Sequence, residues 1–370
     1  MPNLLRKIAL GNERYPALTG VRAVGASVVF FDHFPLWPGE QVVINVLAFF
    51  FVLSGFLIAR IYYAQAQFSM RWLSVYFINR FARIYPVYFL LLSVAVLLSQ
   101  DLRPWTLFSN YTLMHALFPG TPRLIQPSWS LTVEECFYFL APVFMLLARR
   151  YNFLVPLALG SLMLVSALAI SRLGLAFLGS SAFVMSTTFF GHFAEFFAGF
   201  WLALRLIKLE QRGSVRAQGC KRTVLGLAGV SILIGAMVLV YQRPPLDVLR
   251  IIVLNNFLIP IPIVLLYEGL ILEDTLLARW LSGRFIGLLG RASYVFYLMH
   301  SLVIDHLSHS FLPVDSHRML SVLFSFGITW LLSVLLFACY EEPVNLFIRR
   351  TLSDRLLASK RLARGAAGGV

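Results

Sequence analysis

Charged residues are scarce in this sequence. Asp, Glu, Lys and Arg make up 13% of its 370 residues and hydrophobic residues 59%, which leaves too little polar surface to cover a soluble domain. The cysteines have no regular spacing, which excludes a disulfide framework; they are Cys136, Cys220 and Cys339. The sequence also lacks a glycine-rich phosphate loop, a dinucleotide-binding glycine pattern, a zinc-binding His-Glu-x-x-His helix, a Gly-x-Ser-x-Gly elbow and internal repeats. These absences exclude repeat architectures and the soluble enzyme classes that those motifs mark.

Long apolar runs are abundant instead, and ten are long enough to cross a bilayer. They cover residues 20–37, 42–59, 84–100, 133–149, 153–170, 187–206, 224–241, 249–267, 285–304 and 320–339. We therefore expect an all-α, polytopic membrane protein. Residues 1–345 would form its integral-membrane domain, and residues 346–370 a basic tail that contacts anionic lipid. The first run lacks a small-x-small cleavage site, so we interpret it as a retained helix and not a signal peptide.

The formal net charge is +14, but the basic residues fall in short segments between the apolar runs. This pattern reflects membrane topology and not a nucleic-acid-binding surface. Segments on the side that holds both termini contain 24 of the 31 lysines and arginines. The opposite side has only Arg103, Arg123, Arg172, Arg243, Arg250 and Arg318. Because positive charge gathers on the cytoplasmic side, we predict that both termini are cytoplasmic.

Arg22 and His33 lie in the first apolar run, where an ionisable residue needs a partner or a polar cavity. Eleven positions along a helix separate them by about 16 Å and only about 20° of rotation. They therefore share one helix face, Arg22 toward the cytoplasm and His33 toward the outer side. We expect this face to line a site with an anion-holding end and a reactive end.

Two further basic residues, Arg80 and Arg83, would share a helix face at the membrane boundary. Paired guanidinium groups can bind phosphate oxygens, although the bias of positive charge toward the cytoplasm explains the same residues. In the second run, Ser54 and Gly55 are interpreted as a small pair that lets a neighbouring helix approach closely. At the end of the last run, Pro343 is expected to stop the helix, after carboxylates that pair with cytoplasmic arginines.

The fourth run begins with Pro-Ser-Trp-Ser-Leu-Thr-Val-Glu-Glu, in which Ser130 occupies an expected N-cap position. Two adjacent carboxylates exceed what capping needs, so Glu134 and Tyr138, four residues apart, are expected to face a central cavity. Trp129 nearby offers a platform for a sugar ring, although tryptophan is common at membrane interfaces.

Polar residues also interrupt two later runs. Glu195 follows His192 by three positions and lies between Gly191 and Gly199; this spacing favours a hydrogen bond over metal ligation. In a separate stretch, three residues spaced by three form one polar-tipped face: Tyr294, Tyr297 and His300. We expect no metal site and no permanently bound cofactor.

Together these motifs resemble those of the acyltransferase-3 family of bacterial membrane acyltransferases. The resemblance rests on Arg22 and His33 with ten residues between them, Phe50-Phe51-Val52-Leu53-Ser54-Gly55-Phe56, Arg80-x-x-Arg83-Ile84-Tyr85-Pro86, Trp129-Ser130-Leu131-x-x-Glu134, and Ser293-Tyr294 through His300. The motifs occur in family order and span residues 14 to about 345. Such relatives commonly move an acetyl or other acyl group from cytoplasmic acyl-CoA to a hydroxyl on a glycan or lipid-linked sugar in the bacterial inner membrane. Others acylate macrolides or transfer succinyl groups.

The resemblance implies a role for each candidate residue. Arg80 and Arg83 would hold the phosphates of acyl-CoA, in the first place acetyl-CoA, and Arg22 would support the donor partway into the membrane. His33 would act as general base or carry the acyl group itself, since an imidazole suits proton transfer at neutral pH. Glu134 would assist catalysis, with substrate contacts from Trp129, Glu195, Tyr138, Tyr297 and His300.

Two other classes of protein fit the composition. A secondary transporter also has many helices with buried ionisable residues, but it often shows related halves, and none is visible here. A flippase or scaffold of a polysaccharide-export complex needs no histidine at one fixed position. The sequence does not identify the acyl group, the acceptor hydroxyl or the oligomeric state.

Overall fold

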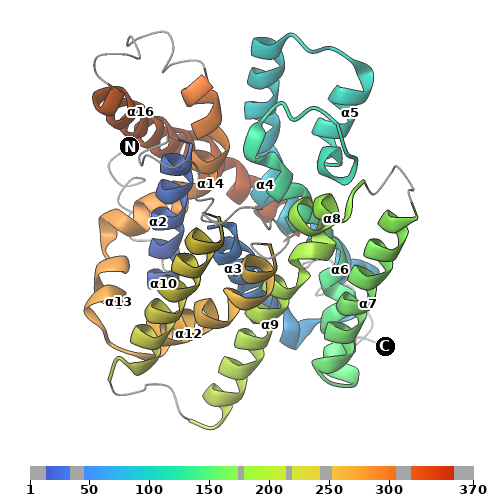
Figure 1. Cartoon of the computed structure of the whole chain (residues 1–370), viewed down its shortest axis with the longest axis vertical. Coiled ribbons are helices and arrows are strands. Elements are labelled where there is room, and N and C mark those ends of the chain that lie inside the picture. Colours follow the sequence, from blue (N-terminus) through green and yellow to red (C-terminus); the bar gives the residue numbers. More distant parts are fainter. Residues whose placement is uncertain are drawn as a thin grey trace, which may run out of the picture.

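The computed structural model describes residues 14–33, 46–173, 179–213, 219–241, 252–305 and 318–353. Every regular element in these ranges is a helix, as predicted (Figure 1). The long helices are α2 (Pro16–Asp32), α3 (Leu47–Tyr62), α4 (Met70–Ser99), α6 (Trp129–Arg150), α7 (Leu154–Arg172), α9 (Phe189–Gln211), α10 (Lys221–Tyr241), α12 (Pro260–Leu272), α14 (Arg284–Val303) and α16 (Arg318–Leu336). The short helices are α5 (Pro104–Tyr111), α8 (Ser181–Thr187), α13 (Leu276–Leu281) and α17 (Glu342–Ile348).

Single helical turns complete the described ranges. They are η1 (Tyr63–Gln65), η2 (His115–Leu117), η3 (Gln126–Ser128), η5 (Leu254–Leu258), η7 (Phe337–Glu341) and η8 (Arg349–Ser353).

Nine helical segments in the described ranges are long and apolar enough to cross a membrane. The predicted run at residues 20–37 is not among these nine; it corresponds to α2, which has 17 residues and carries Arg22. Each of the ten runs predicted from the sequence overlaps one long helix, so the prediction of a multi-pass helical membrane protein is confirmed. Residues 249–251 of the eighth predicted run lie outside the described residues.

The helix pair α3 and α9 crosses near the centre of the molecule (Figure 1). A Cβ atom on Gly55 would collide with the backbone of Phe196, and one on Gly199 would collide with the backbone of Val52. Only glycine therefore permits this close approach of two helix backbones. The interpretation of Gly55 as a packing residue agrees with this contact.

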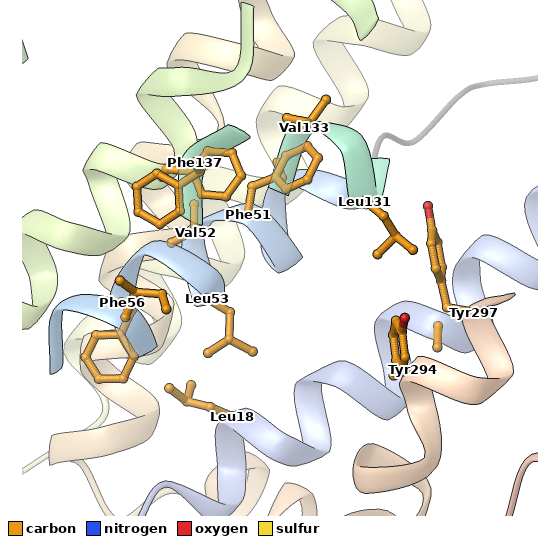
Figure 2. Close-up of a cluster of buried hydrophobic side chains, with 14 of the residues drawn as sticks. Leu18, Phe51, Val52, Leu53, Phe56, Leu131, Val133, Phe137, Tyr294 and Tyr297 are labelled. Carbon is orange, nitrogen blue, oxygen red and sulfur yellow. The ribbon is translucent and has the colours of Figure 1, made fainter. Parts of the chain in front are cut away.

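Aromatic side chains fill the space around the crossing. Figure 2 shows this cluster, to which Phe51 of α3 and Phe137 of α6 contribute. The rings of Phe137 and Phe196 stack with 4.3 Å between centroids, and Phe51 lies 4.9 Å from Phe196. This packing fixes α3, α6 and α9 relative to one another on one side of the cavity described below.

Two predicted helix boundaries are wrong. The helix predicted to begin at residue 84 begins at Met70, because Ser69 caps its first turn by accepting a bond from the Trp72 amide at 3.3 Å. Pro343 does not stop the last helix, because it lies in the first turn of α17, where its missing N–H is not needed. The helical run therefore passes through the predicted domain boundary at residue 345. Residues 354–370 of the predicted tail lie outside the described residues.

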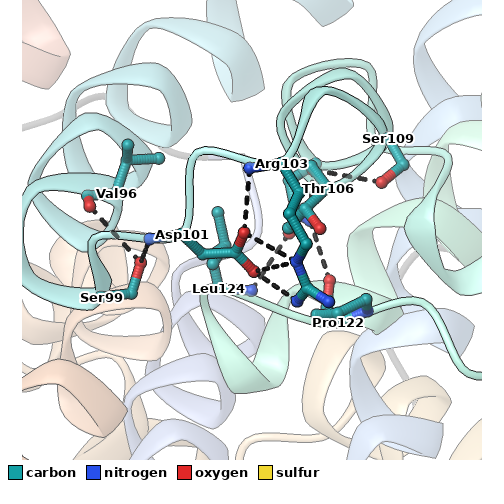
Figure 3. A network of polar contacts seen from close by, with 9 residues as sticks. Val96, Ser99, Asp101, Arg103, Thr106, Ser109, Pro122 and Leu124 are labelled. Carbon is teal, nitrogen blue, oxygen red and sulfur yellow. Dashed lines mark hydrogen bonds and ion pairs between the residues drawn. The ribbon is translucent and has the colours of Figure 1, made fainter.

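Polar contacts within the segment between α4 and α6 hold it together (Figure 3). Arg103 forms an ion pair with Asp101 at 2.6 Å, and these bonds lower the pKa of Asp101 to about 2. The Asn110 side chain donates to the Pro122 carbonyl and accepts from the Leu124 amide. This segment ends at Pro127, which borders the candidate site.

Candidate functional site

A cavity of about 130 Å³ lies between α2, α3, α4, α6 and α14. At roughly 10–15 Å³ for each water, it has room for about ten water molecules. Its polar lining residues are Arg22, Ser54, Arg80, Arg83, Ser130, Glu134, Tyr138, Ser293, Tyr294 and Tyr297. The cavity thus gathers side chains from all five sequence motifs.

Glu134 occupies the α6 wall of the cavity and accepts two hydrogen bonds. The hydroxyls of Ser54 and Tyr138 both donate to its Oε1 atom. The i, i+4 spacing on α6 brings Tyr138 to Glu134, as predicted. Ser54 comes from α3, and its hydroxyl bond shows that it is more than the packing residue we expected. Hydroxyl groups from two different helices therefore hold the Glu134 carboxylate at the cavity wall.

Ser130 lies within α6 and does not cap it, because the helix begins at Trp129. Its hydroxyl is 2.7 Å from the hydroxyl of Tyr297, and both are 3.0 Å from the carbonyl oxygen of Pro127. The N-cap prediction for Ser130 is therefore wrong. The local turn before α6 presents a carbonyl oxygen that these two cavity hydroxyls share.

Arg80 lies between two tyrosine rings. Its guanidinium carbon is 5.5 Å from the ring centroids of both Tyr62 and Tyr138. Its Nη2 atom is 3.4 Å from the Tyr62 hydroxyl. Cation–π contacts of this kind stabilise a guanidinium group away from water.

Arg83 forms an ion pair with Glu341, whose side chain is buried. The Arg83 guanidinium also lies 5.6 Å from the Tyr294 ring centroid. The predicted pairing between the last helix and an arginine is confirmed. Because this pair offsets the charge of Arg83, a phosphate ligand would compete with Glu341 for the same guanidinium group.

Arg22 lines the cavity from α2. His33 lies at the end of the same helix and is exposed. A backbone carbonyl can only accept, so His33 donates from Nδ1 to the Val29 oxygen at 2.8 Å. This bond leaves Nε2 as the nitrogen that can accept a proton.

The ring of His33 packs against that of His300 on α14, with centroids 4.9 Å apart. His300 is fully buried, and its ring lies 5.8 Å from that of Tyr297, which lines the cavity. The two histidines, from opposite ends of the sequence, therefore form a pair next to the cavity. Neither of them is among its lining residues.

Glu195 and Trp129 also lie outside the cavity lining. Glu195 is fully buried and pairs with His192, whose Nδ1 is 2.7 Å from Oε2. The His192 ring lies 5.1 Å from Phe51 and 5.7 Å from Trp129. His192 and Glu195 therefore form a buried hydrogen-bonded pair that packs against the ring of Phe51. The described residues contain no group of three His, Cys, Asp or Glu side chains placed to hold a metal ion.

Comparisons with known proteins bear on this site. The family model described as "Acyltransferase domain" matches residues 15–338. The peptidoglycan O-acetyltransferase OatA of Listeria monocytogenes is 27% identical over 159 residues, which cover 37% of this chain and 25% of that protein. The match therefore spans about a quarter of the relative's length. No solved structure matches the chain.

Proposed function

The chain belongs to the membrane acyltransferase family whose model covers residues 15–338, and we propose that it transfers an acyl group, in the first place acetyl, from acyl-CoA to a glycan hydroxyl. The acceptor would be an extracytoplasmic or lipid-linked sugar, and the protein would lie in a bacterial inner membrane. The partial match to a peptidoglycan O-acetyltransferase supports a carbohydrate acceptor.

One observation carries the proposal. The motifs meet in a single arrangement: a cavity lined by Arg22, Arg80 and Glu134, joined through Tyr297 to the histidine pair. Guanidinium groups suit an anionic donor, and an imidazole whose Nδ1 is already bonded suits proton transfer at Nε2.

In the proposed reaction, Nε2 of His33 takes the proton from the acceptor hydroxyl. The hydroxyl oxygen attacks the thioester carbonyl carbon, and the carbon–sulfur bond breaks. The imidazolium then returns its proton to the leaving thiolate, so that the products are an ester and a free thiol. In the two-step alternative, Nε2 attacks the thioester first and passes the acyl group to the acceptor.

Glu134 would orient the acceptor. It uses Oε1 for the hydroxyls of Ser54 and Tyr138, so Oε2 can accept a bond from a sugar hydroxyl. Tyr138 and Ser54 would hold the carboxylate in place.

The test is the substitution His33→Ala in protein that inserts normally into the membrane. Mass spectrometry of envelope glycans should show loss of O-acylation. Ser27→Ala on the same helix should leave it intact, because within the described part of the chain that hydroxyl bonds only the Ala23 carbonyl of its own helix. Unchanged acylation in the His33 variant would overturn the proposal.

A further inference from the structure

A second cavity, of about 610 Å³, lies where α3 turns into α4. Its walls include Arg71, Trp72 and Tyr76 of α4, Tyr62 of α3 and Arg149 of α6. No carboxylate occurs among its described lining residues. Two guanidinium groups without an acidic neighbour in the same wall make the cavity attractive to an anion.

Arg71 has unused hydrogen-bonding capacity. Its Nε and Nη2 atoms are buried and have no hydrogen-bond partner within the described part of the chain. Buried donors of this kind are normally satisfied, and two adjacent guanidinium N–H groups match the spacing of phosphate oxygens. Arg149 is held at the same cavity by a bond from Nη1 to the Ala66 carbonyl at 2.6 Å.

Aromatic rings form the rest of the wall. The rings of Trp72 and Tyr76 stack with 5.4 Å between centroids and 15° between planes. The ring of Tyr62 meets that of Tyr76 edge to face at 4.9 Å. Such surfaces bind flat heteroaromatic rings by stacking.

The second cavity adjoins the first. Tyr62 lines the second cavity, and Arg80 of the first cavity lies over the Tyr62 ring. Arg71 and Arg80 are nine positions apart on α4, which corresponds to about 14 Å along the helix. The α3–α4 turn also belongs to the side that the lysine and arginine distribution predicts to be cytoplasmic.

We propose that this second cavity binds the phosphorylated nucleotide end of the acyl-CoA donor. Arg71 and Arg149 contact its phosphates and Trp72 contacts the adenine ring, while the pantetheine arm passes Tyr62 and Arg80 into the first cavity. An anionic lipid headgroup also carries a phosphate, but it has no aromatic base that could stack on the rings in the cavity wall. The inference rests on the proposed function. It assigns phosphate binding to arginines other than Arg83, because Arg83 already forms an ion pair with Glu341.

The test compares two donors with the protein in phosphatidylcholine nanodiscs. Arg71→Ala and Trp72→Leu should raise the KM for acetyl-CoA by about tenfold or more, since a charge-assisted contact is lost. Acetyl-pantetheine lacks the nucleotide, so its KM should change less than about twofold, within the spread of a surface substitution. Arg150→Ala is the matched control, because Arg150 is an exposed neighbour of Arg149 outside the cavity.

A binding measurement separates this inference from the proposed function. Adenosine 3′,5′-bisphosphate should bind the wild-type protein in calorimetry and fail to bind the Arg71 variant, whether or not acyl transfer occurs. Equal KM changes for both donors, or no bisphosphate binding to the wild type, would overturn the inference. An Arg71 effect that appears only in nanodiscs with anionic lipid would overturn it in favour of a lipid headgroup. Bisphosphate binding without transfer from either donor would uphold this site and reject the proposed reaction.

Discussion

The imidazole rings of His33 and His300 meet edge to face, with 4.9 Å between their centroids and 72° between their planes. His33 is exposed at the end of α2, whereas His300 is fully buried in α14. The phenyl ring of Phe296 lies nearly parallel to that of His300, 6.3 Å away. The buried ring therefore supports the orientation of the exposed one.

If His300 acts by holding the His33 ring, the transfer rate depends on the flat shape of the His300 side chain and not on its ring nitrogens. His300→Phe keeps a flat ring and should retain most of the transfer rate. His300→Ala removes the support and should lower kcat by about tenfold to a hundredfold, because small displacements of a catalytic group are costly. Steady-state kinetics with saturating donor measures both. Equal losses in the two variants would show that the His300 nitrogens take part directly.

Glu134 and Glu135 are adjacent carboxylates, but only Glu134 lines the cavity. Glu134→Gln removes the charge and keeps the shape, so it should lower kcat/KM for the acceptor by at least about tenfold if that carboxylate orients the sugar. Glu135→Gln is the matched control and should leave the acceptor kinetics near wild type. The reverse ranking of the two variants would assign the role to Glu135.

The ion pair between Arg83 and Glu341 predicts non-additive effects on stability. Arg83→Ala leaves a buried carboxylate without its partner, which for a fully buried pair costs roughly 3–5 kcal/mol. The cost should be smaller here because the Arg83 side chain is 27% exposed. Adding Glu341→Gln should restore part of the lost free energy of unfolding, measured by denaturant titration in detergent. Additive losses would mean that the pair contributes little.

The apolar runs determine most of the fold, so all ten predicted runs overlap long helices. The spacing of the motifs indicated the correct family. The beginning of α4 escaped prediction because Arg71, Asn79 and Arg80 lower its hydropathy, while hydrogen bonding at Ser69 still starts the helix. Hydropathy reports burial in lipid and not helix formation, so it misses polar turns that extend beyond the bilayer.

The candidate site was only partly predictable. Spacing along one helix placed Glu134 beside Tyr138, because a helix repeats every 3.6 residues. The partnership of Ser54 with Glu134 joins two helices, and no periodicity reports such a contact. The same holds for His33 and His300. Sequence spacing therefore identifies the residues of a face, and packing between helices decides which faces meet.

His115 gives a prediction about pH, because it is buried in the segment between α5 and α6 and its Nε2 lies 3.0 Å from the Ser128 hydroxyl. Burial, and secondly the positive charge of Arg123, lower the pKa of His115 from 6.5 to about 4. The unfolded chain therefore takes up a proton near pH 6.5 that the folded protein does not accept until about pH 4. Stability should fall as the pH decreases across this window, by about 2 kcal/mol between pH 7 and pH 5 from this group alone.

His115→Gln does not titrate, so its free energy of unfolding should lose about 2 kcal/mol less over the same interval. Denaturant titrations in detergent at the two pH values measure the difference; an identical pH dependence in both proteins would show that His115 is already accessible to protons in the folded state.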